Sequence, residues 1–363
     1  MANLRRIGIL TAGGDCPGLN AVIRAVVKSG VGKYGLEVVG IEDGYLGLIE
    51  NRMHVMSLAE VSNILTAGGT VLGSSNKAEP SNFAIQQEGR WVRRDVTEEV
   101  LANCRNWNLE ALVVIGGDGT MAGAAKLIER GLKIVGVPKT IDNDLVGTDI
   151  TFGHDTAVAT AAEALDKVHT TAASHHRVMV VELMGRYAGW LALRAGLASG
   201  ADVILIPEIP FRLEAVADIC QRRSRIGKRE TIIAVGEGAM PEGGKVFIDH
   251  VDNNSPDPIR LGGIGKYVAQ ETERLTGIES RSIVLGHVQR GGTPTAHDRI
   301  LATTLACHAM ELLVAGQFGQ MVAVQQGMLK SVPIDQVAGK IHKVSPDDGL
   351  VCAARDIGIS FGN

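Results

Sequence analysis

Two glycine-rich turns in the sequence have the composition of phosphate-binding loops. One reads ILTAGGD at residues 9–15, and the other reads VIGGDGT at residues 114–120. A glycine pair lets backbone N–H groups approach phosphate oxygens closely, and a following helix adds free N–H groups and the positive end of its dipole. A single turn of this kind is often needed only for packing, but two copies favour a phosphate-binding site.

Carboxylates inside these turns suggest that a metal ion accompanies the phosphate. Asp118, in the second turn, supplies the hard oxygen that Mg²⁺ prefers, and this ion commonly bridges phosphate oxygens as well. The alternative for Asp118 is a structural role in an Asx turn or a helix cap. Asp15 in the first turn has the same two options, and the structural one is favoured there.

A third polar segment, PKTIDND at 138–144, follows a short apolar run directly. One of its carboxylates, Asp142 or Asp144, is suited to accept a hydroxyl proton while the other orients the metal or the reacting groups. Lys139 supplies a mobile positive charge for a transferring phosphate. A purely structural polar turn would explain the Asn and Asp residues, but not the lysine among them.

Several arginines flank short apolar runs in the second half of the chain. Because a planar guanidinium matches phosphate oxygens bidentately, arginines at several strand ends suggest a site for a sugar phosphate. One arginine alone is more often part of a surface ion pair, and a lone histidine is more often structural. The candidate residues in this half are Arg177, Arg186, Glu237, Arg281, His287 and Arg290.

The elements that must position these residues follow an alternating pattern of short apolar runs and longer amphipathic segments. Strands are predicted at 7–10, 38–41, 111–115, 133–137, 178–182, 203–207, 231–235 and 282–285. Helices are predicted at 120–130, 154–171 and 297–315, among others. The pattern predicts an α/β fold with two Rossmann-like lobes, each a largely parallel sheet with helices on both faces.

The chain is expected to cross between the lobes more than once. Residues 1–153 and 289–335 are predicted to form one lobe, and residues 154–288 and 336–363 the other. Segment 241–259 is rich in Gly, Pro, Asn and Asp, and it is predicted to be a surface insertion or a long loop.

Composition narrows the class of protein. The 363 residues are 45% hydrophobic but only 4% aromatic, and the net charge is −4, so stacking on nucleic acid and binding to large polyanions are disfavoured. The five cysteines lack paired short spacings and are expected to be buried, reduced thiols, with neither a disulfide framework nor a zinc site. No apolar run reaches transmembrane length, which predicts a soluble, cytoplasmic protein.

Taken together, these segments resemble the phosphofructokinase family over essentially the whole chain. The matching runs are GILTAGGDCPGLN (8–20), GGDGT (116–120), PKTIDND (138–144), VVELMGR (180–186) and GHVQRGG (286–292). The resemblance implies phosphoryl transfer from a Mg²⁺-bound donor to the 1-hydroxyl of fructose 6-phosphate in glycolysis. The lobe containing the N-terminus would bind the donor and Mg²⁺, and the other lobe would bind fructose 6-phosphate.

The resemblance also implies roles for individual residues on the donor and catalytic side. Asp118 would be the Mg²⁺ ligand, and Asp142 would be the general base for the fructose 1-hydroxyl. The residues lining the donor phosphates would be Gly14, Tyr45, Asn76, Lys77, Gly117, Asp118, Gly119 and Thr120. The catalytic residues would be Lys139, Thr140, Asp142 and Arg186.

On the sugar side, the resemblance implies a larger set that includes residues from a second subunit. The substrate-binding residues would be Thr140, Asp142, Asp144, Arg177, Met184, Gly185, Arg186, Glu237, Arg281, His287 and Arg290. Arg177 and Arg281 resemble arginines that reach across a subunit boundary to the 6-phosphate. A homo-oligomer, dimeric or tetrameric, is therefore expected.

The donor is left open between ATP and pyrophosphate, with ATP favoured. Family members that use pyrophosphate tend to have lysine at the position of Lys139 and aspartate at that of Gly119, so this chain has a mixed pattern. Gly119 leaves room for a nucleotide. Asn76 stands where a family arginine usually bridges the donor and sugar phosphates, and Lys77 is a partial substitute. The rival interpretations are an NAD or lipid kinase and a non-catalytic sugar-phosphate-binding subunit.

Overall fold

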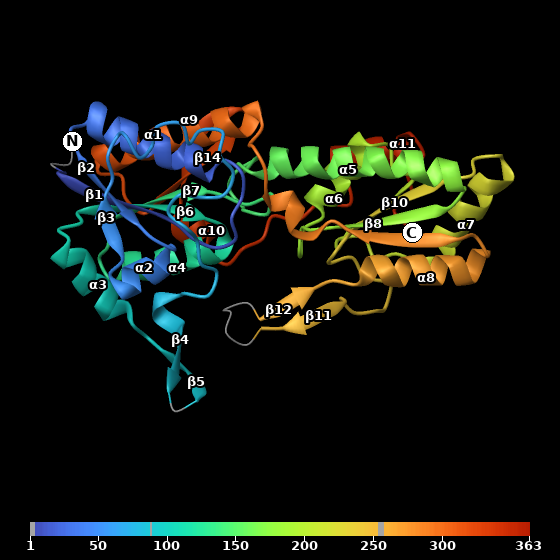
Figure 1. Cartoon of the computed structure of the whole chain (residues 1–363), viewed down its shortest axis with the longest axis horizontal. Helices are drawn as coiled ribbons and strands as arrows, with labels where there is room; N and C mark the ends of the chain where they lie inside the picture. The colour runs from blue at the N-terminus through green and yellow to red at the C-terminus, as the bar shows by residue number, and fades with distance from the viewer. Residues whose placement is uncertain (1–3, 88, 253–257) are drawn as a thin grey trace.

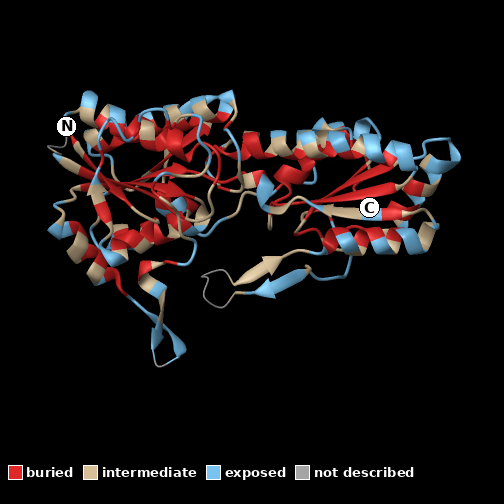
Figure 2. Ribbon diagram, viewed as in Figure 1, coloured by how far each residue is buried: buried red, intermediate tan, exposed pale blue. Residues whose placement is uncertain are grey.

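In the computed structural model, which describes residues 4–87, 89–252 and 258–363, the chain forms two α/β halves that lie side by side (Figure 1). Each half has a central sheet of buried strands between layers of helices (Figure 2). This is the predicted α/β architecture of two largely parallel sheets with helices on both faces. Within these ranges no helix is both long and apolar enough to cross a membrane.

The first sheet contains seven strands among the described residues, in the order β15-β14-β7-β6-β1-β2-β3. Its central pairs are parallel, and antiparallel pairs, β14–β15 and β2–β3, close its two ends. The strands are β1 (Arg6–Thr11), β2 (Glu37–Ile41), β3 (Met53–Val55), β6 (Ala111–Gly116), β7 (Ile134–Pro138), β14 (Gln320–Gln325) and β15 (Met328–Pro333).

Helices cover both faces of this sheet because its central strands are apolar on both sides. On one face, α1 (Leu19–Gly32) and α9 (Ala296–Ala315) pack against each other and against β1, β6 and β7. The other face is covered by α2 (Tyr45–Glu50), α3 (Thr97–Asn106), α4 (Asp118–Glu129) and α10 (Ile334–Val337) (Figure 1).

The second sheet is parallel in its described part and has the order β13-β8-β10-β9. Its strands are β8 (Val178–Leu183), β9 (Val203–Leu205), β10 (Thr231–Gly236) and β13 (Ser280–Val284). The helices α5 (His154–His175), α6 (Trp190–Ala198) and α11 (Gly349–Asp356) cover one face, and α7 (Leu213–Arg225) and α8 (Ile264–Thr276) cover the other. The short 3₁₀ helix η2 (Gly286–Arg290) follows β13.

Two antiparallel hairpins project from this body (Figure 1). β4 (Phe83–Gln87) and β5 (Arg90–Arg94) follow the 3₁₀ helix η1 (Pro80–Asn82), and β11 (Ile248–Val251) pairs with β12 (Ile259–Leu261). The prediction of a surface insertion at 241–259 is confirmed, since β11 is exposed along its length. The alternative prediction of a long loop is wrong for the two paired strands, and residues 253–257 lie outside the described ranges.

The predicted strands and the three predicted helices are all present, with ends shifted by a few residues. The cysteine prediction is wrong for two of the five side chains. Cys16, Cys104 and Cys220 are buried, but Cys307 and Cys352 are exposed. The two exposed thiols lie on α9 and α11, whose inner faces are filled by other apolar residues.

Candidate active site

The three candidate segments of the first half leave the sheet at one edge. Thr11 of β1 pairs with Ile115 of β6, and Gly116 of β6 pairs with Pro138 of β7, so the turns after these parallel strands lie next to one another. A side chain at position 116 would collide with Thr120, so glycine is required for α4 to start this close to the strand. The sheet edge therefore brings together segments 12–15, 117–120 and 139–144, as α/β proteins do at ligand sites.

Two cations converge on the first of these turns. The Lys139 ammonium donates to the carbonyl oxygen of Gly14, and Arg290 Nη1 donates to the carbonyl oxygen of Asp15 over 3.1 Å. Lys139 is only 4% exposed. Burial lowers its pKa, and the neighbouring charge of Arg290 lowers it further. A buried ammonium and a guanidinium side by side form a strong attraction for phosphate oxygens.

The second turn opens α4 with Asp118 as the first helical residue. The positive end of the helix dipole therefore lies at this carboxylate and at the free N–H groups beside it. A side chain placed at Gly119 would meet no described atom within 4 Å, so the surface beside the helix start is open. Tyr45 lies beneath α4, almost fully buried, and its hydroxyl donates to the carbonyl oxygen of Thr120 over 2.7 Å.

The loop at residues 73–77 borders the first turn. The N–H of Gly13 donates to the carbonyl oxygen of Ser75 over 3.1 Å, and Ser74 Oγ donates to the carbonyl oxygen of Gly13 over 2.6 Å. Asn76 and Lys77, which are predicted to bind the donor, follow directly after these two serines. The Lys77 ammonium lies 3.3 Å from a carboxylate oxygen of Asp252, which is the last described residue before the gap at 253–257.

Asp142 and Asp144 form a pair of buried carboxyl groups at the end of β7. Burial raises the pKa of Asp142, the charges of Arg290 and Lys139 oppose this, and Glu237 raises it further. Burial and the charges of Asp142 and Asp118 raise the pKa of Asp144 to about 7. Each of the two carboxyl groups has one buried oxygen without a hydrogen-bond partner among the described residues.

A frame of residues that sequence reasoning did not single out holds the loop carrying this pair. Asn143 adopts a positive φ of 53°, and its side-chain oxygen accepts from the N–H of Thr151 over 2.9 Å. The Thr151 hydroxyl donates to the carbonyl oxygen of Thr140 over 2.8 Å. An Asn between two Asp residues is a signal for such a turn, because Asn tolerates positive φ better than most residues.

His154 at the start of α5 is a second support for this loop. Its Nδ1 lies 2.6 Å from the carbonyl oxygen of Ile141. Burial lowers the pKa of His154 to about 4, so the ring is neutral near pH 7 and Nδ1 donates this hydrogen bond. The contact joins segments 13 residues apart, and residue type alone did not distinguish this histidine from the nine others.

The second sheet presents its candidate residues at the carboxyl ends of β8, β10 and β13. Leu183 pairs with Gly236, so the segments Met184–Arg186 and Glu237 leave the sheet together. Gly185 has a φ of 136°, a conformation that requires glycine, and Glu237 accepts a hydrogen bond from the N–H of Arg186 over 3.0 Å. Burial raises the pKa of Glu237.

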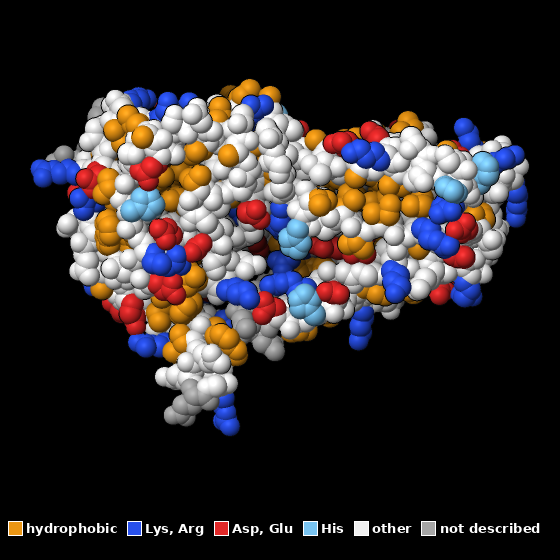
Figure 3. All heavy atoms as spheres, viewed as in Figure 1, with side chains coloured by type: hydrophobic (Ala, Val, Ile, Leu, Met, Phe, Trp, Pro, Cys, Tyr) orange, Lys and Arg blue, Asp and Glu red, His pale blue; other side chains and the backbone are white. Residues whose placement is uncertain are grey.

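The two sheet edges face each other. The charges of Glu237, Arg186 and Arg290 all act on the pKa of Asp142, which places residues of the second half beside the buried carboxyl pair. His287 and Arg290, in η2, lie on the segment that returns the chain to the first half. The molecular surface is hollowed between the halves, and side chains of both charges line the hollow (Figure 3).

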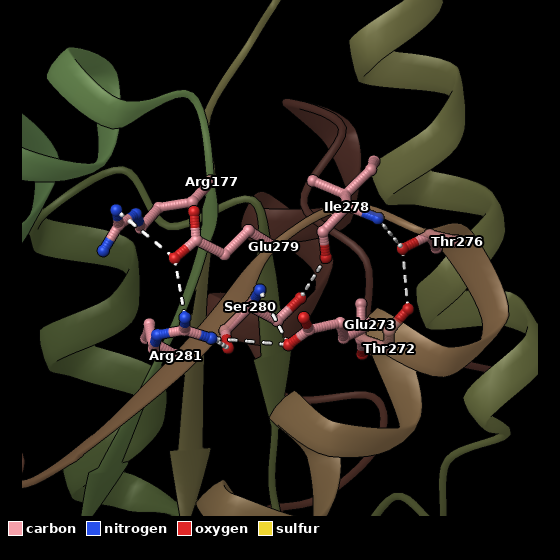
Figure 4. A network of polar contacts seen from close by, with 8 residues as sticks. All are labelled: Arg177, Thr272, Glu273, Thr276, Ile278, Glu279, Ser280 and Arg281. Atoms are coloured by element: carbon pink, nitrogen blue, oxygen red, sulfur yellow. Dashed lines mark hydrogen bonds and ion pairs between the residues drawn. The ribbon is translucent and has the colours of Figure 1, made fainter.

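Arg177 and Arg281 are not part of this cluster within one chain. They lie at the opposite, amino-terminal ends of β8 and β13 (Figure 4). Arg177 lies 3.4 Å from Glu279, and Arg281 lies 2.7 Å from the same carboxylate and 3.5 Å from Glu273. The structure therefore leaves Arg177 and Arg281 at the far end of the second sheet.

The fold and the site define an α/β protein built to hold phosphorylated ligands between two sheet edges. The model of the phosphofructokinase family matches residues 6–313, and the chain belongs to this family. The chain is 48% identical to ATP-dependent 6-phosphofructokinase 2 of Clostridium perfringens, with both chains covered to 100%. It is 47% identical to the pyrophosphate–fructose 6-phosphate 1-phosphotransferase of Amycolatopsis methanolica, over 94% of this chain and 97% of that one.

Among solved structures, the phosphofructokinase of Saccharomyces cerevisiae superimposes with a TM-score of 0.77 at 32% sequence identity. The match covers 92% of this chain but only 45% of the yeast chain. The arrangement of the two halves is therefore that of the family, in a chain less than half the length of the yeast subunit.

Proposed function

We propose that this chain is an ATP-dependent 6-phosphofructokinase, which transfers a phosphoryl group from Mg²⁺–ATP to the 1-hydroxyl of D-fructose 6-phosphate in glycolysis. The observation that carries the proposal is the buried Asp142–Asp144 pair beside Lys139 and Arg290. It combines a proton acceptor with two phosphate-binding cations at the point where the two sheet edges meet. We assign the enzyme to the cytoplasm, where glycolysis takes place.

In this reaction Asp142 accepts the proton of the fructose 1-hydroxyl as that oxygen attacks the terminal phosphoryl group. Its raised pKa makes the carboxylate a stronger base than an exposed aspartate. Lys139 and Arg290 neutralise the charge on the phosphoryl oxygens, and positioning supplies much of the remaining rate. Thr140 keeps the loop in place through its hydroxyl, which accepts from the N–H of Asp142 over 3.0 Å.

The residues present fit a Mg²⁺ ion that would be bound together with the donor. Asp118 offers a carboxylate at the helix start, and Asp144 has a buried carboxylate oxygen without a described partner. Both are hard oxygen ligands, and Mg²⁺ usually takes only one or two of these from a protein together with phosphates and water. Bound there, Mg²⁺ would neutralise donor charge. No cluster of three or more His, Cys, Asp or Glu side chains suited to a metal occurs within the described ranges.

The two halves divide the substrates between them. We propose that residues 1–153 and 289–335 bind the donor, with Gly14, Asn76 and Lys77 near its phosphates. Residues 154–288 and 336–363 would bind the sugar, with Arg186 and Glu237 on the fructose hydroxyls. The 6-phosphate would lie on His287 and Arg290.

The oligomer completes this sugar site. Arg177 and Arg281 lie too far from the cluster to serve it within one chain, so we propose that they reach the 6-phosphate bound by a neighbouring subunit. Their present partner, Glu279, shows that both guanidinium groups are directed to one anionic group. A dimer is the smallest assembly that meets this requirement.

Pyrophosphate is the second candidate donor, because Lys139 and the relative from A. methanolica both fit it. The open surface at Gly119 favours ATP, since it leaves space for the rest of a nucleotide beside the helix start. Initial rates with fructose 6-phosphate and either ATP or pyrophosphate, each with Mg²⁺ and with EDTA, test the choice. We expect a higher kcat/KM with ATP. A higher value with pyrophosphate would reverse the donor assignment, and activity with neither would remove the enzymatic function.

A further inference from the structure

The hairpin β11–β12 is the largest feature near the site for which the proposed function gives no role. Val251 pairs with Ile259 and Ile248 pairs with Leu261, and the hairpin extends from the second half toward the first (Figure 1). β11 is exposed along its length and β12 is half-buried, so the two strands lie outside the buried apolar core. The polar contacts of the hairpin with the two halves therefore indicate its role.

Two of these contacts reach residues of the candidate site. Asp252, just after β11, has a carboxylate oxygen 3.3 Å from the ammonium of Lys77, which belongs to the first half. Arg186 Nη2 donates to the carbonyl oxygen of Ile259 in β12 over 3.5 Å. The hairpin thus joins a donor-side lysine to a sugar-side arginine across the hollow between the halves.

Lys77 lies beside the first glycine turn, where a bound phosphoryl donor would contact it. Its loop is fixed to the first glycine turn by the hydrogen bonds between Gly13 and residues Ser74 and Ser75. Its side chain is 56% exposed, whereas that of Asp252 is only 22% exposed. The Asp252 carboxylate is therefore held more firmly than the Lys77 ammonium, which can turn toward a new ligand.

We propose that Asp252 competes with the donor phosphates for Lys77 and so sets how tightly the enzyme binds its phosphoryl donor. The inference rests on the proposed function, because it takes Lys77 as a donor-binding residue. A carboxylate and a phosphate have the same sign of charge and repel each other when both approach one ammonium. Donor binding therefore requires Lys77 to exchange Asp252 for phosphate.

Arg260 makes this exchange possible. Its Nη2 lies 3.8 Å from the same carboxylate oxygen of Asp252 that faces Lys77. When Lys77 turns to the phosphate, Asp252 still has a cation beside it, so no isolated carboxylate remains. The hairpin residue thus raises the cost of donor binding without closing the site.

The variant Asp252→Asn tests the proposal, since it keeps the size of the side chain and removes its charge. A partly exposed ion pair contributes at most about 1 kcal/mol, so we expect the KM for Mg²⁺–ATP to fall about two- to fivefold with kcat unchanged. Asp249→Asn is the matched control, because Asp249 is an exposed acid of the same hairpin that pairs with the neighbouring His250. Its donor KM should equal that of the wild type.

A second pair of variants shows whether the effect passes through Lys77. In a Lys77→Met background, Asp252→Asn should leave the donor KM unchanged, because the ammonium for which Asp252 and the donor compete is absent. An unchanged or higher KM in the single variant would overturn the proposal. A decrease in the donor KM that persists in the Lys77→Met background would also overturn it. A decrease of the same size in Asp249→Asn would do so as well.

Wild-type turnover separates this test from that of the proposed function. If the wild type phosphorylates fructose 6-phosphate but Asp252→Asn has an unchanged donor KM, only the role of Asp252 is wrong. If the wild type turns over neither donor, the proposed function is wrong. Calorimetric titration of the wild type and the same variants with Mg²⁺–ATP then measures the competition directly. A two- to fivefold lower Kd is expected for Asp252→Asn, and an unchanged Kd would contradict the proposal.

Discussion

Asp142 and Asp144 stand two residues apart, and their surroundings give them different tasks. Asp142 is 5% exposed, and Arg290 and Lys139 beside it favour its charged form. Asp144 has no such cation among its main influences, and two other carboxylates raise its pKa to about 7. Asp142 is thus the better base, whereas the carboxyl group of Asp144 is partly protonated near neutral pH.

Replacing Asp142 by Asn removes the proton acceptor and keeps the shape of the side chain. General base catalysis contributes about 10²- to 10⁴-fold, so we expect kcat to fall by that factor while the affinity for fructose 6-phosphate stays close to that of the wild type. Initial rates and calorimetric titration with fructose 6-phosphate measure the two quantities. Asp149→Asn, an exposed acid seven residues further on, is the control. A variant at 142 with most of its rate would refute the base assignment.

The carboxyl pair also predicts how the rate depends on pH. A protonated Asp142 cannot accept the hydroxyl proton, and burial raises the pKa of this carboxyl group. The value of kcat/KM should therefore be lost as the pH falls, at a higher pH than an exposed aspartate would give. Asp144→Asn removes the neighbouring negative charge and should shift this acid limb to lower pH. A pH–rate profile from pH 5 to 9 shows both effects, and an unshifted limb in the variant would argue against the coupling.

For single residues, the sequence predicted which side chains have a chemical use better than it predicted the contacts that hold them in place. Lys139, Asp142 and Asp144 were identified because a cation and two acids after a buried run have a chemical use. Thr151 and His154 were missed, since their roles depend on hydrogen bonds to backbone carbonyls of a separate segment. Nothing in residue type distinguishes a threonine or histidine that makes such a bond from one that faces water.

Among the helices, α5 and α9 meet at their amino ends through one buried carboxylate. Asp298 of α9 accepts hydrogen bonds from the N–H groups of Gly153 and Thr156 over 2.9 and 2.8 Å, and from the Thr156 hydroxyl over 2.6 Å. The hydroxyl of Thr295, the N-terminal cap of α9, donates to a carboxylate oxygen of Asp155 in the first turn of α5. These contacts join the segment that enters the second half to the segment that leaves it.

Replacing Asp298 by Ala should therefore destabilise the fold without touching the site. The change leaves two backbone N–H groups and a hydroxyl without their acceptor in a fully buried place, and each costs about 1–3 kcal/mol. We expect a clearly lower urea midpoint, corresponding to about 3 kcal/mol or more. Asp348→Ala, which removes the solvent-facing cap of α11, should cost about 1 kcal/mol. Equal midpoints for the two variants would show that the network contributes little.

Element prediction succeeded where burial on both faces of a sheet leaves continuous apolar runs, as at β6 and β10. It was less successful at 241–259, where Gly, Pro and Asn suggested a loop and the described part forms two paired strands. The strands are short, one exposed and the other half-buried, so they lack the apolar alternation that identifies a strand. Their pairing and their contact with Lys77 are long-range properties that composition does not reveal.

In the whole molecule, the opposite ends of the second sheet carry different sets of candidate residues. Arg186 and Glu237 follow the carboxyl ends of β8 and β10, whereas Arg177 and Arg281 lie at the amino ends of β8 and β13. The six residues of β8 span roughly 20 Å, which is beyond the reach of an arginine side chain. The proposed role of the two arginines in sugar binding therefore depends on a neighbouring subunit.

Mixing two inactive variants tests this sharing of residues between subunits. Asp142→Asn lacks its base and Arg281→Ala lacks its shared arginine, so each alone should be nearly inactive. In a mixed dimer, the site with an intact Asp142 receives an intact Arg281 from the other subunit. Denaturing an equimolar mixture and refolding it should restore about one quarter of the wild-type activity, because half of the dimers have one complete site. No recovery in a refolded oligomer would place both residues in the same chain's site.

The most direct test of the whole account is to identify the product. Purified protein is incubated with fructose 6-phosphate and Mg²⁺–ATP, and the phosphorus NMR spectrum of the mixture is followed over time. We expect fructose 1,6-bisphosphate and ADP to appear in equal amounts, and neither to appear when Asp142→Asn replaces the wild type. ADP without a bisphosphate, or no change in fructose 6-phosphate with either ATP or pyrophosphate, would contradict the account.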